Sequence, residues 1–146
     1  MSHKYTRVYL KGRIDHEDIL NVLIENIDAQ AVSEVKKVIY PIIPEWEHIH
    51  YEPQKDWISE YGFIYYKDPS GNKQSIFYDY ENVNHLTNLD YYTKLGLEDM
   101  AKCEKTVLIA NDSSLSFDIL STIAKRFGGW IDKNDEDTWT ELMPEQ

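Results

Sequence analysis

The sequence predicts an α+β fold, in which residues 1–146 form a single domain. We expect a mostly antiparallel sheet with two or three helices packed on one face. Three observations lead to this prediction. Apolar residues alternate at the period of a strand near the N-terminus, a turn sequence joins two aromatic-rich strands in the middle of the chain, and residues 106–130 contain a complete strand–helix–strand unit.

The first third of the chain predicts a strand, a helix and a second strand. Residues 5–14 alternate between exposed-type and apolar side chains, which is typical of a half-exposed strand. Asp15 is placed to cap a helix of about three turns, whose apolar stripe consists of Ile19, Leu20, Leu23, Ile24 and Ile27. Residues 32–43 are ambiguous between strand and helix, but β-branching favours a strand. Pro41 and Pro44 indicate that this strand is an edge or ends there.

The middle of the chain predicts a long loop followed by a hairpin. Residues 45–60 read as a loop with short ordered pieces, part of which we expect to shield the sheet face opposite the helices. Residues 61–66 and 75–80 are the two predicted strands, because Pro69, Ser70 and Gly71 between them suit a tight turn. Residues 81–90 read as a loop, and residues 91–102 show mixed helical periodicity that Gly96 weakens.

The strand–helix–strand unit at residues 106–130 has every local signal that such a unit needs. A β-branched apolar strand at residues 106–110 is followed by four residues that can cap a helix. The helix then shows one apolar stripe, formed by Leu115, Ile119, Leu120, Ile123, Ala124 and Phe127. Gly128 and Gly129 stop it, and an apolar run resumes at Trp130. We expect a turn at residues 132–137 and a last strand at residues 138–142.

Composition and charge exclude several classes of function. Fifteen basic residues against 26 acidic ones give a net charge of −11, which repels nucleic-acid backbones and favours a basic protein partner or simply high solubility. No apolar run approaches the roughly 18 to 20 residues that span a bilayer, and no signal peptide is visible, so we expect a cytoplasmic protein. The one cysteine excludes an internal disulfide.

Three groups of residues resemble catalytic or metal sites only in part, and no cofactor is predicted from them. His48, His50 and Glu52 share a face of an extended segment, but the alternative is an acidic surface loop with incidental histidines. Residues 132–143 resemble a calcium loop in which Asp137 stands where glycine is needed and Met143 where glutamate is needed. Cys103 and His85 lack the surrounding signature of a nucleophile and its base. A non-enzymatic protein is therefore the main prediction, and a metal-dependent enzyme is one alternative.

Tyrosine and tryptophan lie close to carboxylates in the sequence, which is typical of protein interfaces. The tyrosine and tryptophan residues of the middle third are Trp46, Tyr51, Trp57, Tyr61, Tyr65, Tyr66, Tyr78, Tyr80, Tyr91 and Tyr92. The alternative is that they pack across strands or cover a core. The predicted partner-binding surface consists of Glu45, Trp46, Glu47, Glu52, Asp56, Trp57 and Glu60, joined by Asp135, Glu136 and Asp137. A small-molecule-binding regulatory domain with an aromatic pocket is a second alternative.

The sequence from Phe127 to Trp139, FGGWIDKNDEDTW, resembles the ending of certain small acidic bacterial proteins. Some of these resemble immunity proteins of polymorphic toxin systems. The resemblance covers roughly residues 106–139 and carries over no functional residue. It implies a one-domain α+β protein that binds and neutralises a basic toxin or nuclease. Charge complementarity would speed the association with such a partner.

Overall fold

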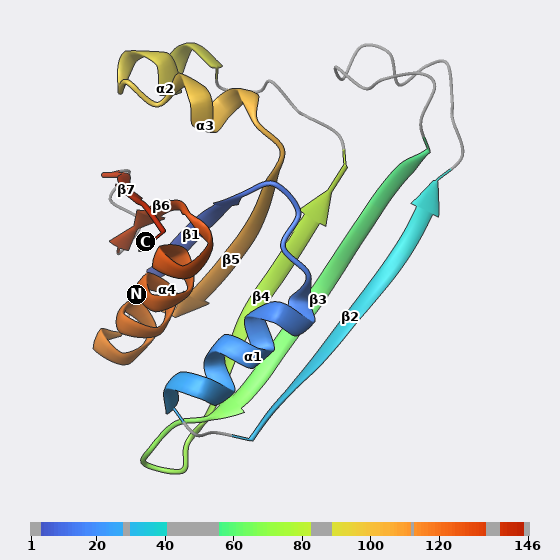
Figure 1. Ribbon diagram of the computed structural model, residues 1–146, viewed down its shortest axis with the longest axis vertical. Helices are drawn as coiled ribbons and strands as arrows, with labels where there is room; N and C mark the ends of the chain where they lie inside the picture. Colours follow the sequence, from blue (N-terminus) through green and yellow to red (C-terminus); the bar gives the residue numbers. More distant parts are fainter. Residues whose placement is uncertain are drawn as a thin grey trace.

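The computed structural model describes residues 4–27, 30–40, 56–82, 89–111, 113–133 and 138–144. Strands and helices alternate irregularly along the chain (Figure 1). In order they are β1 (Tyr5–Lys11), α1 (His16–Ile27), β2 (Ala31–Tyr40), β3 (Trp57–Lys67), β4 (Lys73–Glu81), α2 (Leu89–Lys94), α3 (Glu98–Lys102), β5 (Lys105–Asn111), α4 (Ser114–Phe127), β6 (Gly129–Asp132) and β7 (Thr140–Leu142).

All seven described strands form one sheet in the order β2-β3-β4-β5-β1-β6-β7, and every neighbouring pair is antiparallel. The predicted α+β class with an antiparallel sheet is therefore confirmed. The predicted strand–helix–strand unit is β5-α4-β6. Its two strands are separated by β1, which is antiparallel to both, so α4 carries the chain across β1 (Figure 1).

The pairing register assigns each residue to one face of the sheet, because directly opposite residues point the same way. Val8 lies opposite Leu108 and Ile131, and Leu108 lies opposite Tyr78. These residues are buried, and they form one core with buried apolar side chains of α1 and α4, which include Ile19, Leu23, Leu120 and Ile123. Both long helices therefore cover the same face of the sheet, which Figure 1 also shows.

The described residues contain four helices, one more than the largest number predicted. The extra helix arises because residues 91–102 do not form one unit: α2 ends at Lys94 and α3 begins at Glu98. Gly96, between them, has a φ of 76°, a left-handed conformation that interrupts a helix. The two short helices pack against each other at one end of the sheet (Figure 1).

The predicted helix ends are confirmed in detail. Asp15 accepts a hydrogen bond of 2.8 Å from the backbone N–H of Glu17 at the start of α1. Ser113 is the N-cap of α4, since its hydroxyl accepts the N–H of Ser116 at 3.1 Å. Gly128 follows the last turn of α4 with a φ of 86°.

The hairpin prediction is confirmed, but both of its strands are longer than expected. β3 begins at Trp57, so residues 57–60 are part of the sheet and not of a loop. Their strand geometry was missed because Trp57 and Ile58 follow a polar, proline-containing stretch. Residues 41–55 lie outside the described part of the chain, including the remainder of the expected loop. β2 is an edge strand, as predicted.

Candidate binding surface

The face of the sheet opposite α1 and α4 exposes aromatic side chains. In β3, Ile64 and Tyr66 point into the core, so the alternating positions Tyr61, Phe63 and Tyr65 point the other way. These three side chains are 39%, 40% and 39% exposed. Because an uncovered sheet face is ordinarily polar, three large exposed rings on one strand are unusual.

Neighbouring strands extend this surface. Phe63 lies opposite Phe77 of β4, which lies opposite Ile109 of β5. The ring centroids of Phe63 and Phe77 are 5.5 Å apart, and those of Phe63 and Tyr65 are 5.9 Å apart. One row further along the strands, Val107 of β5 is half-buried on the same face. We call this set the aromatic patch: Tyr61, Phe63, Tyr65, Phe77, Val107 and Ile109.

Beyond the patch, Trp139 lies against Tyr9 and Arg7 of β1 on the same face. The ring of Trp139 lies 4.6 Å from that of Tyr9, and the guanidinium carbon of Arg7 lies 5.0 Å from its centroid. Arg7 forms an ion pair with Asp132, which is fully buried. The second oxygen of Asp132 accepts the backbone N–H of Thr138 at 2.9 Å. Asp132 therefore anchors the chain segment that carries Trp139 over the sheet.

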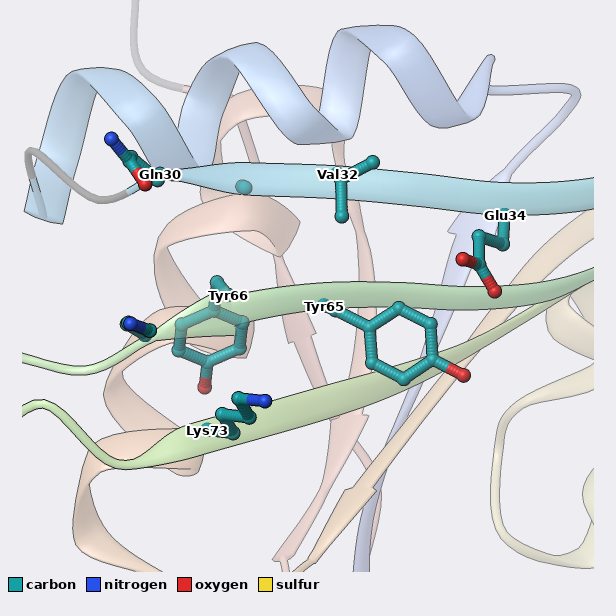
Figure 2. Close-up of a pocket in the computed structure, with 8 residues that line it drawn as sticks. Gln30, Val32, Glu34, Tyr65, Tyr66 and Lys73 are labelled. Atoms are coloured by element: carbon teal, nitrogen blue, oxygen red, sulfur yellow. The ribbon is translucent and has the colours of Figure 1, made fainter.

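A pocket of about 650 Å³ adjoins the patch at the β2 side of the sheet. Figure 2 shows that its side chains come from three neighbouring strands: Val32 and Glu34 from β2, Tyr65 from β3 and Lys73 from β4. Lys67, which also lines it, lies opposite Lys73 in the β3–β4 pair. The pocket thus combines an aromatic wall with two cationic groups and the carboxylate of Glu34.

A polar cluster lies on the helix side of the sheet, where β1 leads into α1. Arg13 donates two hydrogen bonds of 2.9 Å to the buried carboxylate of Glu60. The Tyr80 hydroxyl donates to Glu104 at 2.8 Å, and the Tyr78 hydroxyl donates to a backbone carbonyl of the β1–α1 connection. Burial raises the pKa of both phenols. These hydrogen bonds tie the β1–α1 connection to β3 and β4.

The structure describes only part of the predicted partner-binding surface. Asp56 is exposed, and Trp57 is half-buried with its ring centroid 5.8 Å from that of Tyr40. Glu60 is 5% exposed and its carboxylate is held by Arg13, so it does not contribute to an outer surface. The remaining members lie outside the described residues: Glu45, Trp46, Glu47, Glu52, Asp135, Glu136 and Asp137. Their assignment stays a prediction.

The other candidate groups gain no support from the described residues. His48, His50, Glu52 and His85 lie outside them, and within them no group of three or more His, Cys, Asp or Glu side chains is placed to hold a metal. The first position of the calcium-like loop, Asp132, is occupied by Arg7 and Thr138. Burial raises the pKa of Cys103, which is the opposite of what a nucleophilic thiol needs.

The tyrosines that the sequence pointed to lie on both faces of the sheet. Tyr66, Tyr78 and Tyr80 are core residues, whereas Tyr61 and Tyr65 belong to the exposed patch. Phe63, Phe77 and Ile109 were missed because each lies in a short run of apolar and aromatic residues, at 63–66, 76–78 and 107–110, which gives no alternation to interpret. The weak signal was that β3 carries large apolar residues at both odd and even positions, which is excessive for a sheet with one covered face.

Comparisons of the chain with protein-family models, with curated proteins and with solved structures found no match. Among the described residues, no helix is both long and apolar enough to cross a membrane.

Proposed function

We propose that this protein is a non-enzymatic binding domain whose aromatic patch contacts another protein. The observation that carries the proposal is the exposure of Tyr61, Phe63 and Tyr65, at 39–40%, on a sheet face that neither long helix covers. Contiguous exposed apolar surface is characteristic of interaction sites. Tyrosine and phenylalanine contribute large contact areas and lose little conformational entropy on binding, which suits an interface.

The proposed partner is a protein with a basic surface. A net charge of −11 attracts basic proteins over several ångströms and accelerates their association. At the patch itself the neighbouring charges are mixed, since Glu34 and Lys36 lie beside it on β2 and Asp79 lies on β4. Charge would therefore steer the approach, and the aromatic rings would provide the contact. Arginine is the favoured partner residue because its guanidinium stacks on aromatic rings.

An immunity or inhibitor role fits this proposal. A small acidic protein that covers the basic active site of a toxin or nuclease needs a rigid contact surface and fast association, and it needs no catalytic group. The antiparallel sheet supplies a rigid surface for the patch. Trp57 is the first residue of β3, the strand that carries Tyr61, Phe63 and Tyr65, and Asp56 immediately precedes it. The acidic residues predicted at 45–52 and 135–137 belong to the same proposal.

The test is a capture experiment followed by a titration. Proteins retained from cell extract by the immobilised chain are identified by mass spectrometry, purified and titrated by calorimetry against wild type and the Phe63→Ser variant. We expect the dissociation constant to rise about 10-fold or more for Phe63→Ser, because central aromatic residues carry most interface energy. It should also rise with salt, because a basic partner is attracted by charge.

The matched control is Leu95→Ser, which removes an exposed apolar side chain from the connection between α2 and α3 and leaves the sheet face unchanged. Its affinity should equal that of wild type. Equal binding by wild type and Phe63→Ser would refute the assignment of the patch, and failure to retain any basic protein would refute the partner class.

The pocket beside Tyr65 favours a second candidate function, the binding of an anionic aromatic metabolite. Its volume of about 650 Å³ falls within the range of ligand pockets, and Lys67 and Lys73 supply the positive charge. A thermal-shift screen of anionic metabolites tests this idea. A ligand should raise the melting temperature of wild type and have a smaller effect on Lys73→Ala. No stabilisation by any compound would leave only the protein-binding proposal.

A further inference from the structure

Among the described strands, β2 forms one edge of the sheet along ten residues. The opposite edge, β7, has three residues. A long edge strand presents backbone N–H and C=O groups that can pair with another strand. Two large apolar side chains of β2, Val32 and Ile39, are 56% and 57% exposed, so this edge also carries uncovered apolar surface.

The sequence of β2, AVSEVKKVIY, is complementary to itself about Val35. If two copies pair antiparallel with Val35 opposite Val35, Glu34 of each copy lies opposite Lys36 of the other. Val32 then lies opposite Val38, and Ala31 lies opposite Ile39. On their own face of the sheet the central ion pairs are thus flanked by Val32–Val38 pairs, which is a favourable cross-strand arrangement, and Ser33 lies opposite Lys37 on the helix side.

In this register, the helix-covered faces of the two copies also lie on the same side of the joined sheet. In the pairing with β3, Val35 and Ser33 lie opposite Gly62 and Ile64 on the helix side, and Glu34 lies opposite Phe63 on the other side. A twofold axis perpendicular to the sheet at Val35 pairs helix-side residues with helix-side residues. Shifting the pairing centre by one residue in either direction also keeps both helix-covered faces on one side. Those two registers, however, place Glu34 opposite Glu34 or Lys36 opposite Lys36, and like charges directly opposite each other are destabilising.

Helix α1 supplies a second, independent observation. His16, at the start of α1, contacts Ser33 of β2 through a 2.8 Å hydrogen bond between Nδ1 and Oγ. Leu20 and Ile24 follow at four-residue intervals, so they lie in the same row along the β2 side of the helix. Leu20 is half-buried, whereas Ile24 is 41% exposed. In the twofold arrangement this row faces the same row of the second copy, which would cover Ile24.

We infer that a second copy of this chain binds along β2, so that two sheets join into one through antiparallel β2–β2 pairing centred on Val35. Nine residue pairs, from Ala31 to Ile39 of each copy, would form roughly nine backbone hydrogen bonds. The aromatic patch lies on the sheet face, not on its edge, so each copy keeps its own binding surface. The inference does not depend on the proposed partner.

Charge swaps test the register, with sedimentation equilibrium as the measurement. Wild type should show a reversible monomer–dimer equilibrium. Lys36→Glu places a second carboxylate opposite Glu34 at two symmetric positions, so the dimer dissociation constant should rise about 10-fold or more. The double variant Glu34→Lys with Lys36→Glu restores both ion pairs with their direction reversed, and should dimerise like wild type. Lys125→Glu on α4 is the charge-matched control and should leave dimerisation unchanged.

A cross-linking experiment tests the same geometry at the centre of the pairing. In a Cys103→Ser background, Val35→Cys should cross-link between copies on oxidation, because the two thiols lie opposite each other. Lys37→Cys should not, because Ser33 lies opposite that position. Circular dichroism confirms the fold of each variant. A wild-type chain that remains monomeric up to high micromolar concentration would overturn the inference. Lys36 and Lys37 would then be charges that keep the edge strand from pairing with other chains. A double swap that fails to restore the dimer would also overturn it.

Discussion

Two adjacent residues of β3 provide a direct test of which sheet face is covered. Ile64 is fully buried beneath the helices, whereas Phe63 is 40% exposed on the opposite face. Replacing a fully buried isoleucine by alanine removes its transfer free energy and leaves a cavity, so Ile64→Ala should lower the free energy of unfolding by about 3 kcal/mol. Phe63→Ala removes a larger side chain that is only partly buried, so the loss should be about 1 kcal/mol.

Urea and thermal unfolding measure this difference. For a chain of this size, 1 kcal/mol corresponds to roughly 3 °C in melting temperature, so we expect a decrease of about 9 °C for Ile64→Ala and about 3 °C for Phe63→Ala. Binding to a captured partner should respond in the opposite order, with the larger loss at Phe63. If Phe63→Ala destabilised the fold as much as Ile64→Ala, the patch would be covered by the protein itself, and the proposed surface would be refuted.

Three further predictions follow from local geometry and burial. Gly129→Ala should lower the urea midpoint severely, because an added Cβ would lie 2.3 Å from the carbonyl oxygen of Tyr9; near-wild-type stability would contradict the close approach of β6 to β1. Ser113→Ala should cost about 1 kcal/mol in the same assay through loss of the α4 cap, and an unchanged midpoint would argue against that cap. Burial raises the pKa of Tyr78 and Tyr80 above 10.0, so the stability that they contribute is present below pH 10 and is lost as the pH rises above it. An alkaline absorbance titration should show these two phenols ionising only when the protein unfolds. A single transition of all tyrosines at their ordinary pKa would contradict the burial of Tyr78 and Tyr80.

Local signals in the sequence predicted most of the elements correctly. The α4 cap at Ser113, the stop at Gly128 and the hairpin turn at residues 69–71 each depend on side chains within a few residues of one another. Such contacts do not depend on the rest of the fold. The division between α2 and α3 was missed because Gly96 only weakens a helical pattern in sequence, and its left-handed conformation is what ends the helix.

The sequence predicted the types of residue that form the binding surface, but not which individual residues form it. The abundance of tyrosine, tryptophan and carboxylates in the middle of the chain indicated an interface, but the residues proposed for it were chosen by proximity in sequence. Glu60 shows the weakness of that choice, because Arg13, distant in sequence, occupies its carboxylate. Long-range pairing of this kind leaves no local pattern that could be recognised beforehand.

By itself, the sequence determined most of the segments that become helices and strands, the start of α1 and both ends of α4, because these depend on contacts between near neighbours in the chain. It also determined the acidic charge and the single thiol. Only the tertiary structure decided that β1 lies between β5 and β6, and that Tyr61, Phe63 and Tyr65 lie on the face opposite the two long helices. The reason is that strand order sets which face is covered, and strand order arises from pairing between segments far apart in the chain.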